Sequence, residues 1–543
     1  MKKYLFILLT LFLFIFSAEL FSADYYWVGG SGNWSDTLHW ATASGGSTFH
    51  SAPPSSDDNV FFNASSFSGP DTVTIDVMAE CNNMDWTGAA HSPLITGMWG
   101  LRISGNMKCI SAMSFYSTSI SFDSDGIHTI DFGGMVLSDG GISFNGLTGD
   151  GVWTLLSDLT LTGVFSSIML NNGTLITNGH TISLPGNIHV MGGAMKSGLY
   201  LGNSTVNCSG LNIMAPMNFT FDAGTSTINI LNGSSSFSGN NYVFYDVNFF
   251  GLSFGSELYI GGSNSFHNLS FDSIPVIRFQ QGMSQVIQGN ITFNGSCGYP
   301  VTVISSESGK PAYLLKVSGT VSEDFLCLRD ITAAGGGSFV SANSTNLGNV
   351  INWTITPPSD TVFYWVGGSG NWNDAGHWSF TSGGAPNNVC IPDAADDVVF
   401  NAASFTAPGQ TVSIASEVFC KSMNWTGVTN NPQLNFGGFG VNLNLFGSLT
   451  LSAGMSLSGG SYIVFHGATA GNTITTNGIA LSTVTFTGAG EYTFNDAATI
   501  SSLYFEHGTL RTNNRPLALG SFNSWTNQSR QLYLGSSIIT VTT

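Results

Sequence analysis

Hydrophobic and polar residues alternate along most of this chain in short runs, a period that is typical of β-strands with one buried face. Examples are the stretches 72–77, 154–161, 181–184, 226–231 and 538–541. Each run ends in Gly, Asn or Ser, which favour turns. Helical periodicity is nearly absent, so the pattern predicts an all-β protein.

A repeat of 22 residues lies within this pattern. Ser204–Asn207 recurs as Ser226–Asn229, and Tyr245–Phe249 recurs as His267–Phe271, both 22 residues later. A fixed period of roughly 20 to 50 residues is typical of solenoids, in which each coil stacks on the one before. We therefore predict a right-handed parallel β-helix, or β-solenoid. An array of β-sandwiches is the alternative fold, and the short period argues against it.

A longer duplication surrounds this repeat. The motif YWVGGSGNW occurs at residues 26–34 and again at 364–372, and stretches 172–178 and 199–204 have counterparts at 507–513 and 532–537. The duplication predicts two tandem β-solenoid units joined by a Pro-rich linker. The expected segments are a signal peptide at 1–23, a first unit at 24–356, a linker at 357–360 and a second, truncated unit at 361–543.

The second unit stops at the counterpart of about residue 210 of the first unit. Its last strand, 538–541, is β-branched and lacks Pro and charge. An uncovered strand of this kind offers its backbone groups to other strands. We expect this end to stack on another protein, on a second copy or on further repeats.

The duplicated motif holds three Trp residues around a Gly-rich turn in each unit. Two interpretations are open: the indoles cover one end of the β-core, or they form a flat platform for sugar rings. We favour the structural interpretation, and we expect His39 and His377 to pack within the same aromatic cluster. The motif residues are Trp27, Gly29, Gly30, Asn33, Trp34 and Trp40 in the first unit, and Trp365, Gly367, Gly368, Asn371, Trp372 and Trp378 in the second.

The amino terminus has the layout of a secretory signal. Lys2 and Lys3 precede an apolar run from residue 4 to 16, and small residues follow between 17 and 23. The run is shorter than the roughly 20 residues that cross a membrane. We therefore expect a secreted or cell-surface protein without a transmembrane anchor.

The composition limits the partners of the exported chain. Removal of the signal peptide takes the formal charge from −19 to −20, which disfavours nucleic acid as a partner. Only 8% of the residues are charged, whereas 42% are hydrophobic, so the chain is expected to build a core under a surface of Ser, Thr, Asn and Gly.

Seven cysteines are scattered through the chain without a CxxC pair, so no zinc site is predicted. Most are expected to be small buried side chains. Cys390 and Cys420 belong to corresponding blocks of the second unit, and we predict that they form a disulfide after export.

No constellation of residues predicts a catalytic, metal or cofactor site. The pairs Asp57–Asp58 and Asp396–Asp397 lack the alternating acidic ladder of a calcium loop, so turn capping is favoured. The exported chain has only eleven Lys and Arg residues, which argues against a lyase for acidic glycans. Carboxylates from distant coils can still meet, so hydrolysis of neutral glycans stays open.

Several motifs resemble large secreted β-repeat proteins of bacteria and phage-like genomes, which are loosely similar to the haemagglutinin and autotransporter β-helix group. They are the WVGGSGNW opening, the blocks 57–67 and 396–405, the Trp-Thr-Gly at 86–88 and 425–427, and the GTLxTN and LYLGxS strands. The resemblance implies an extracellular β-solenoid and carries over no catalytic residue.

These observations together predict a structural or adhesive protein of the cell surface or the extracellular space, without enzymatic activity and without a cofactor. A β-helix glycoside hydrolase or polysaccharide lyase is the alternative, and a glycan-binding module is the third choice. Expected partners are glycans, other surface proteins or further copies of the chain.

Overall fold

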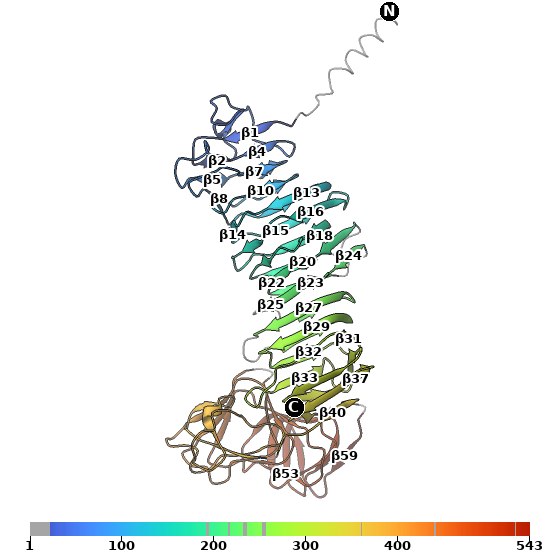
Figure 1. Ribbon diagram of the computed structural model, residues 1–543. Helices are drawn as coiled ribbons and strands as arrows, with labels where there is room; N and C mark the ends of the chain where they lie inside the picture. Colours follow the sequence, from blue (N-terminus) through green and yellow to red (C-terminus); the bar gives the residue numbers. More distant parts are fainter. Residues whose placement is uncertain are drawn as a thin grey trace, which may run out of the picture. The chain divides into compact units, whose positions relative to one another are not determined.

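The strands of this protein stack in parallel as a β-solenoid of about 21 turns, which confirms the predicted all-β solenoid (Figure 1). The computed structural model describes residues 22–542 except 192–194, 215–217, 232–235, 252–256, 360, 439–440 and 527. The described helices are two 3-10 turns, η1 (Thr37–His39) and η2 (Ala375–His377). No helix in this part of the chain is long and apolar enough to cross a membrane. Residues 1–21 of the predicted signal peptide lie outside the described residues.

The chain divides into two compact units, which are described separately. Unit 1 holds the residues up to 248 except 235–237, and unit 2 holds 235–237 and the residues from 249 onward. The division falls at β26 (Ser236–Ser238) and β27 (Val243–Phe250). The limits expected from the duplication, 24–356 and 361–543, describe the sequence repeat and stay a prediction.

The coils of unit 1 contribute strands to three sheets, which we call A, B and C; in the first coil two strands, joined antiparallel, belong to sheet A. Sheet A contains β1 (Asp24–Trp27), β3 (Trp40–Ala41), β4 (Asn59–Phe61), β7 (Met84–Asp85), β10 (Met107–Lys108), β13 (Gly126–Asp131), β16 (Gly151–Leu155), β18 (Ile168–Ile176), β21 (Ser197–Tyr200) and β24 (Phe219–Asp222). Sheet B contains β2 (Gly32–Asn33), β5 (Thr72–Ile75), β8 (Leu94–Gly97), β11 (Ser114–Tyr116), β14 (Val136–Ser138), β17 (Leu159–Leu161), β19 (Ile182–Ser183), β22 (Thr205–Cys208) and β25 (Thr227–Leu231). Sheet C contains β6 (Ala79–Cys81), β9 (Leu101–Ile103), β12 (Ile120–Phe122), β15 (Ile142–Asn145), part of β18, β20 (Asn187–Val190) and β23 (Gly210–Ile213).

The 22-residue period is the register of this stack. Thr205 pairs with Thr227 and Val206 with Ile228, as the sequence repeat predicts. Because side chains alternate between the two faces of a strand, residues one period apart point the same way and stack. Phe122 and Phe144, for example, are both buried, and their rings stack with centroids 5.4 Å apart.

Asparagines hold corners of the coils. Asn178 has φ 54°, in the left-handed region that Asn adopts more readily than most residues. Its side-chain amide donates a hydrogen bond to the carbonyl of Leu155 in the preceding coil. Asn477 has φ 49° and donates in the same way to Leu451. The side chain therefore supplies a contact between coils where the chain turns.

Unit 2 contains two stacks. The first stack, residues 257–355, consists of three sheets. One contains β28 (Glu257–Gly261), β30 (Val276–Phe279), β33 (Val301–Ser305), β36 (Leu326–Arg329) and β39 (Thr345–Asn346), and another contains β29 (Asn264–Asp272), β31 (Ser284–Ile287), β32 (Ile291–Thr292), β34 (Ala312–Lys316) and β37 (Ile331–Gly335). The third contains β35 (Thr320–Asp324), β38 (Ser338–Ala342) and β40 (Trp353–Ile355). Among the described strands, these pair with none of the strands that follow residue 361.

The second stack, residues 362–541, repeats the three-sheet plan of unit 1, and we call its sheets A′, B′ and C′. Sheet A′ contains β41 (Val362–Trp365), β43 (Trp378–Ser379), β44 (Asp397–Val399), β47 (Met423–Asn424), β50 (Leu449–Thr450), β53 (Asn472–Thr475), β55 (Glu491–Phe494), β57 (Gly508–Arg511) and β59 (Arg530–Tyr533). Sheet B′ contains β42 (Gly370–Asn371), β45 (Thr411–Ile414), β48 (Gln433–Phe436) and β51 (Ser456–Ser458). Sheet C′ contains β46 (Val418–Cys420), β49 (Asn442–Leu445), β52 (Tyr462–Phe465), β54 (Leu481–Phe486), β56 (Ala498–Phe505), β58 (Leu517–Asn523) and β60 (Ile539–Val541).

The correspondence between the two copies extends to single hydrogen bonds. The buried hydroxyl of Thr177 contacts the carbonyl of Leu201 and the hydroxyl of Ser204. Thr512 makes the same two contacts, with Leu534 and Ser537. The sequence duplication therefore reflects a duplicated structure.

Candidate functional site

The three Trp residues of each opening motif lie in the core. Trp27, Trp34 and Trp40 are at most 1% exposed. The indole N–H of Trp27 donates to the carbonyl of Gly30, and that of Trp40 donates to the carbonyl of Trp34. Trp365, Trp372 and Trp378 repeat this arrangement with Gly368 and Trp372 as acceptors. Because the rings have no exposed face, they offer no platform for a sugar.

The glycines of the motif have left-handed backbone angles, and a histidine packs beside them. Gly29 and Gly30 have φ of 85° and 72°, which strongly favour glycine. The ring of His39 stacks on Trp27 with a centroid distance of 4.7 Å, and its Nδ1 lies 2.6 Å from the carbonyl oxygen of Val28. His377 stacks on Trp365 in the second copy. Asn33 and Asn371 lie in strands β2 and β42, which pair with β5 and β45.

One member of each predicted acidic pair caps a turn. Asp58 accepts hydrogen bonds from the backbone N–H and hydroxyl of Ser55 and from the backbone N–H of Ala23. Asp396 accepts from the backbone N–H groups of Asp393 and Thr361. Within the described residues no three His, Cys, Asp or Glu side chains are grouped to hold a metal ion. Asp58 and Asp396 therefore each act within their own turn, whereas Asp397 begins strand β44.

The predicted disulfide between Cys390 and Cys420 is wrong. Cys390 is bonded to Cys297, 93 residues earlier, with their Cα atoms 4.8 Å apart. Cys420 lies in β46 and is fully buried, and burial raises the pKa of its thiol. The prediction compared only the two copies of the duplication, whereas the true partner of Cys390 belongs to the last third of the first copy.

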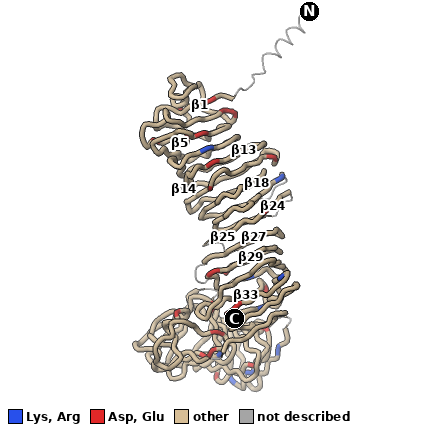
Figure 2. The backbone as a smooth tube through the Cα atoms, viewed as in Figure 1, with Lys and Arg blue, Asp and Glu red and all other residues tan. Residues whose placement is uncertain are grey.

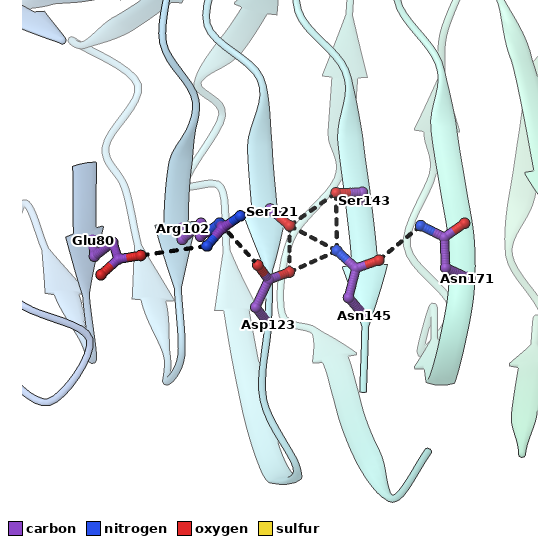
Figure 3. A network of polar contacts seen from close by, with 7 residues as sticks. All are labelled: Glu80, Arg102, Ser121, Asp123, Ser143, Asn145 and Asn171. Carbon is purple, nitrogen blue, oxygen red and sulfur yellow. Dashed lines mark hydrogen bonds and ion pairs between the residues drawn. The ribbon is translucent and has the colours of Figure 1, made fainter. Parts of the chain in front are cut away.

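A strip of polar side chains crosses sheet C of unit 1 (Figure 3). Arg102 lies between Glu80 and Asp123, at 3.5 and 3.3 Å. The strip continues from Asp123 to Asn145, and the side-chain amide of Asn171 donates to Asn145 at 2.7 Å. The hydroxyls of Ser121 and Ser143 join the same network. One line of contacts thus links five successive coils.

The counterpart of this strip in sheet C′ is neutral and buried. Register places Phe419 beside Asn444, as it places Glu80 beside Arg102. His466 follows β52 as Asp123 follows β12, and it contacts Asn444 at 2.8 Å and Thr487 at 2.8 Å. Burial lowers the pKa of His466 to about 3, so this ring is neutral. The charged residues of the exposed strip in sheet C thus correspond to uncharged residues in sheet C′, where these positions are buried.

Charged side chains of the first stack face sheet C′ within unit 2. Arg329 of β36 interacts electrostatically with Glu417, His466 and Glu506 of the second stack. Burial raises the pKa of Glu417 and of Glu506, and the positive charge of Arg329 opposes this rise. Charged residues are few along the chain, so a cluster of one arginine and two carboxylates is uncommon in this protein (Figure 2).

A cavity of about 440 Å³ lies between the two stacks of unit 2. Glu257 at its wall accepts two hydrogen bonds from Arg278, at 2.7 and 2.6 Å. Glu417 also lines the cavity and accepts one from the side-chain amide of Asn444 at 3.1 Å. The two carboxylates meet although 160 residues separate them in the chain. The sequence analysis did not predict this cavity. A difference between the two copies could have indicated it, because Glu417 of the second copy corresponds to the apolar Met78 of the first.

Comparisons of this chain with protein-family models, with curated proteins and with solved structures found no match.

Proposed function

We propose that this protein is a secreted or cell-surface structural and adhesive element that binds neutral glycans or surface proteins through an extended polar face. The observation that carries the proposal is the polar strip of sheet C, in which hydroxyl, amide and charged side chains of successive coils are hydrogen-bonded into one line (Figure 3).

Such a surface favours many weak contacts. Asn207 and Asn229 form a second ladder on sheet B, where the amide of Asn229 donates to Asn207 at 2.8 Å. Amides and hydroxyls held in position donate to and accept from the hydroxyls of a polysaccharide without a large desolvation cost. Contacts repeated along a chain of sugars add their effects through multivalency.

The favoured partner is uncharged. The formal charge, −19 for the full chain and −20 without the predicted signal peptide, repels nucleic acids and anionic polymers. The described residues of the strip include one cation, Arg102, which two carboxylates already neutralise. The resemblance of several sequence motifs to those of secreted β-repeat proteins also supports an extracellular location.

The experiment is a co-sedimentation of the mature protein with a panel of insoluble neutral polysaccharides, combined with an assay for released reducing ends. We expect binding without release. The double variant Asn145→Ala/Asn171→Ala should bind at least about tenfold more weakly, because it interrupts the strip. The control is Ser114→Ala on exposed β11 of sheet B.

Two results would contradict the proposal. One is equal binding by the strip variant and the control. The other is release of reducing ends that disappears in Glu417→Gln, which would instead establish a glycoside hydrolase.

A further inference from the structure

The cavity of unit 2 has walls from two distant segments of the chain. Its lining comes from the first stack and from residues 372–441 of the second stack. The disulfide joins these walls, because Ser296 and Gly298 flank Cys297, Ile391 follows Cys390, and all three line the cavity. The cavity is thus held in shape by a covalent bond.

The charged residues that line the cavity are all acidic. The charged residues among its described lining are Glu257, Asp272 and Glu417, without a Lys or Arg. Arg278 compensates Glu257 through its two hydrogen bonds. Glu417 forms no ion pair within 4 Å among the described residues, and its side-chain hydrogen bonds come from neutral amides, those of Asn444 and Asn442. Arg329 acts on Glu417 only at longer range, and a partly buried carboxylate without a cation in contact costs free energy.

An unused acceptor lies in the same lining. The Oδ1 atom of Asn373 is buried and accepts no hydrogen bond from the described residues, while its amide group donates to Ser416 at 2.5 Å. The remaining walls are apolar and include Ile391, Val418, Phe419 and Val441. The cavity thus combines a negative charge, a free acceptor and a hydrophobic surface.

We propose that this cavity binds a primary ammonium group on an apolar stem, with Glu417 as its counter-ion. The ammonium group supplies only donors, which suits a carboxylate and the free amide oxygen. The stem packs on the apolar walls. A neutral sugar would place no positive charge in contact with Glu417. The ligand is either a free alkylamine or the side chain of a Lys residue in a partner protein.

The test is isothermal titration calorimetry of the oxidised mature protein with hexylammonium chloride, with 1-hexanol as the neutral probe of equal length. We expect hexylammonium to bind at least about tenfold more tightly than hexanol, since one charge-assisted contact is worth at least about 1.4 kcal/mol. Glu417→Gln should abolish the difference. Glu307→Gln, an exposed carboxylate outside the cavity, should retain it.

A second variant tests the cavity independently, in case Glu417→Gln does not fold. Val441→Trp fills the cavity and keeps Glu417, so it should weaken both probes. Nα-acetyl-lysine methylamide distinguishes the two sources: binding equal to that of hexylammonium indicates a Lys side chain, and much weaker binding indicates a free amine. Equal affinity for hexylammonium and hexanol, or full binding by Glu417→Gln with an unchanged melting temperature, would overturn the proposal.

Discussion

Gly32 and Gly370 are each packed against the imidazole ring of a histidine. A Cβ atom added to Gly32 would lie 2.0 Å from Nε2 of His39, and one added to Gly370 would lie 2.0 Å from Nε2 of His377. The stacked His and Trp rings leave the imidazole little room to move away. The glycine therefore fixes how closely the turn approaches the aromatic cluster.

Gly32→Ala should consequently lower the free energy of unfolding by about 1 to 3 kcal/mol, as overpacking of a core does. Thermal unfolding followed by circular dichroism measures the change. Gly69→Ala is the control, because an added Cβ there has no atom within 4 Å. If both variants melt at the wild-type temperature, the ring of His39 moves freely and the packing argument fails.

Glu323 carries a pH dependence of stability. Burial raises the pKa of this carboxyl to about 7, against a hydrogen bond from the backbone N–H of Phe293 at 2.9 Å. The folded protein therefore holds the proton more tightly than the unfolded chain. The contribution of Glu323 to stability is fully present below the ordinary pKa of 4.5 and is lost as the pH rises through about 7.

We expect Glu323→Gln to lose less stability than the wild type between pH 4.5 and 7, the interval between the ordinary and the raised pKa. Melting temperatures across this interval test the prediction. Glu307→Gln serves as the comparison, because the ion pair with Lys310 lowers the pKa of Glu307 instead. Parallel curves for wild type and Glu323→Gln would show that the pKa of Glu323 is the same in the folded and unfolded protein.

At the scale of elements, the disulfide joins a loop of the first stack to a loop of the second. It closes a segment of 93 residues. Cross-links of this span typically stabilise by about 2 to 5 kcal/mol, largely by restricting the unfolded chain. Disulfides persist in oxidising environments, which the proposed export would provide.

The double variant Cys297→Ser/Cys390→Ser should therefore melt at a lower temperature than the oxidised wild type. Reductant should lower the melting temperature of the wild type and leave that of the variant unchanged. Mass mapping of non-reduced protein should find the Cys297–Cys390 peptide pair, with Cys420 alkylated only after unfolding. A pair between Cys390 and Cys420 would contradict the structure.

The sequence was informative wherever neighbouring coils repeat one another. Thr205 and Thr227 are in register because the same alternation recurs 22 residues later, so the strands and their buried faces could be predicted. The cavity and the disulfide depend instead on how residues near 257–300 meet residues near 372–441. Periodicity contains no information on such contacts. Differences between the two copies could have indicated these contacts. Asp123 of the first copy corresponds to His466 of the second, where the outer face of the sheet is buried and a charged side chain is replaced by a neutral one.

At the scale of the whole molecule, the last coil of the second stack exposes apolar side chains. Trp525, Ile538 and Val541 are more than half exposed, and β60 pairs only with β58 among the described strands. Apolar groups beside an unpaired strand edge favour association with another strand. The predicted stacking of copies at this end stays a prediction.

Val541→Lys should reduce self-association of the mature protein, because a charge at an exposed strand edge opposes pairing. Light scattering over a range of concentrations measures the effect. Thr499→Lys, an exposed position of β56 on the same sheet, adds the same charge away from the edge. A wild type that is monomeric at every concentration would remove the basis for the prediction.

The covalent bond between Cys297 and Cys390 also bears on how the protein would respond to mechanical tension. A pull applied through the two ends of the chain bypasses the 93-residue segment, because force passes across the sulfur atoms instead of along the backbone between them. Coils outside the segment would lengthen, while about 300 Å of extended chain stayed stored. Single-molecule stretching with and without reductant would reveal that reserve as an additional extension step. If the protein serves the proposed adhesive role, such a reserve would set how far an attachment lengthens before the segment closed by the disulfide unfolds.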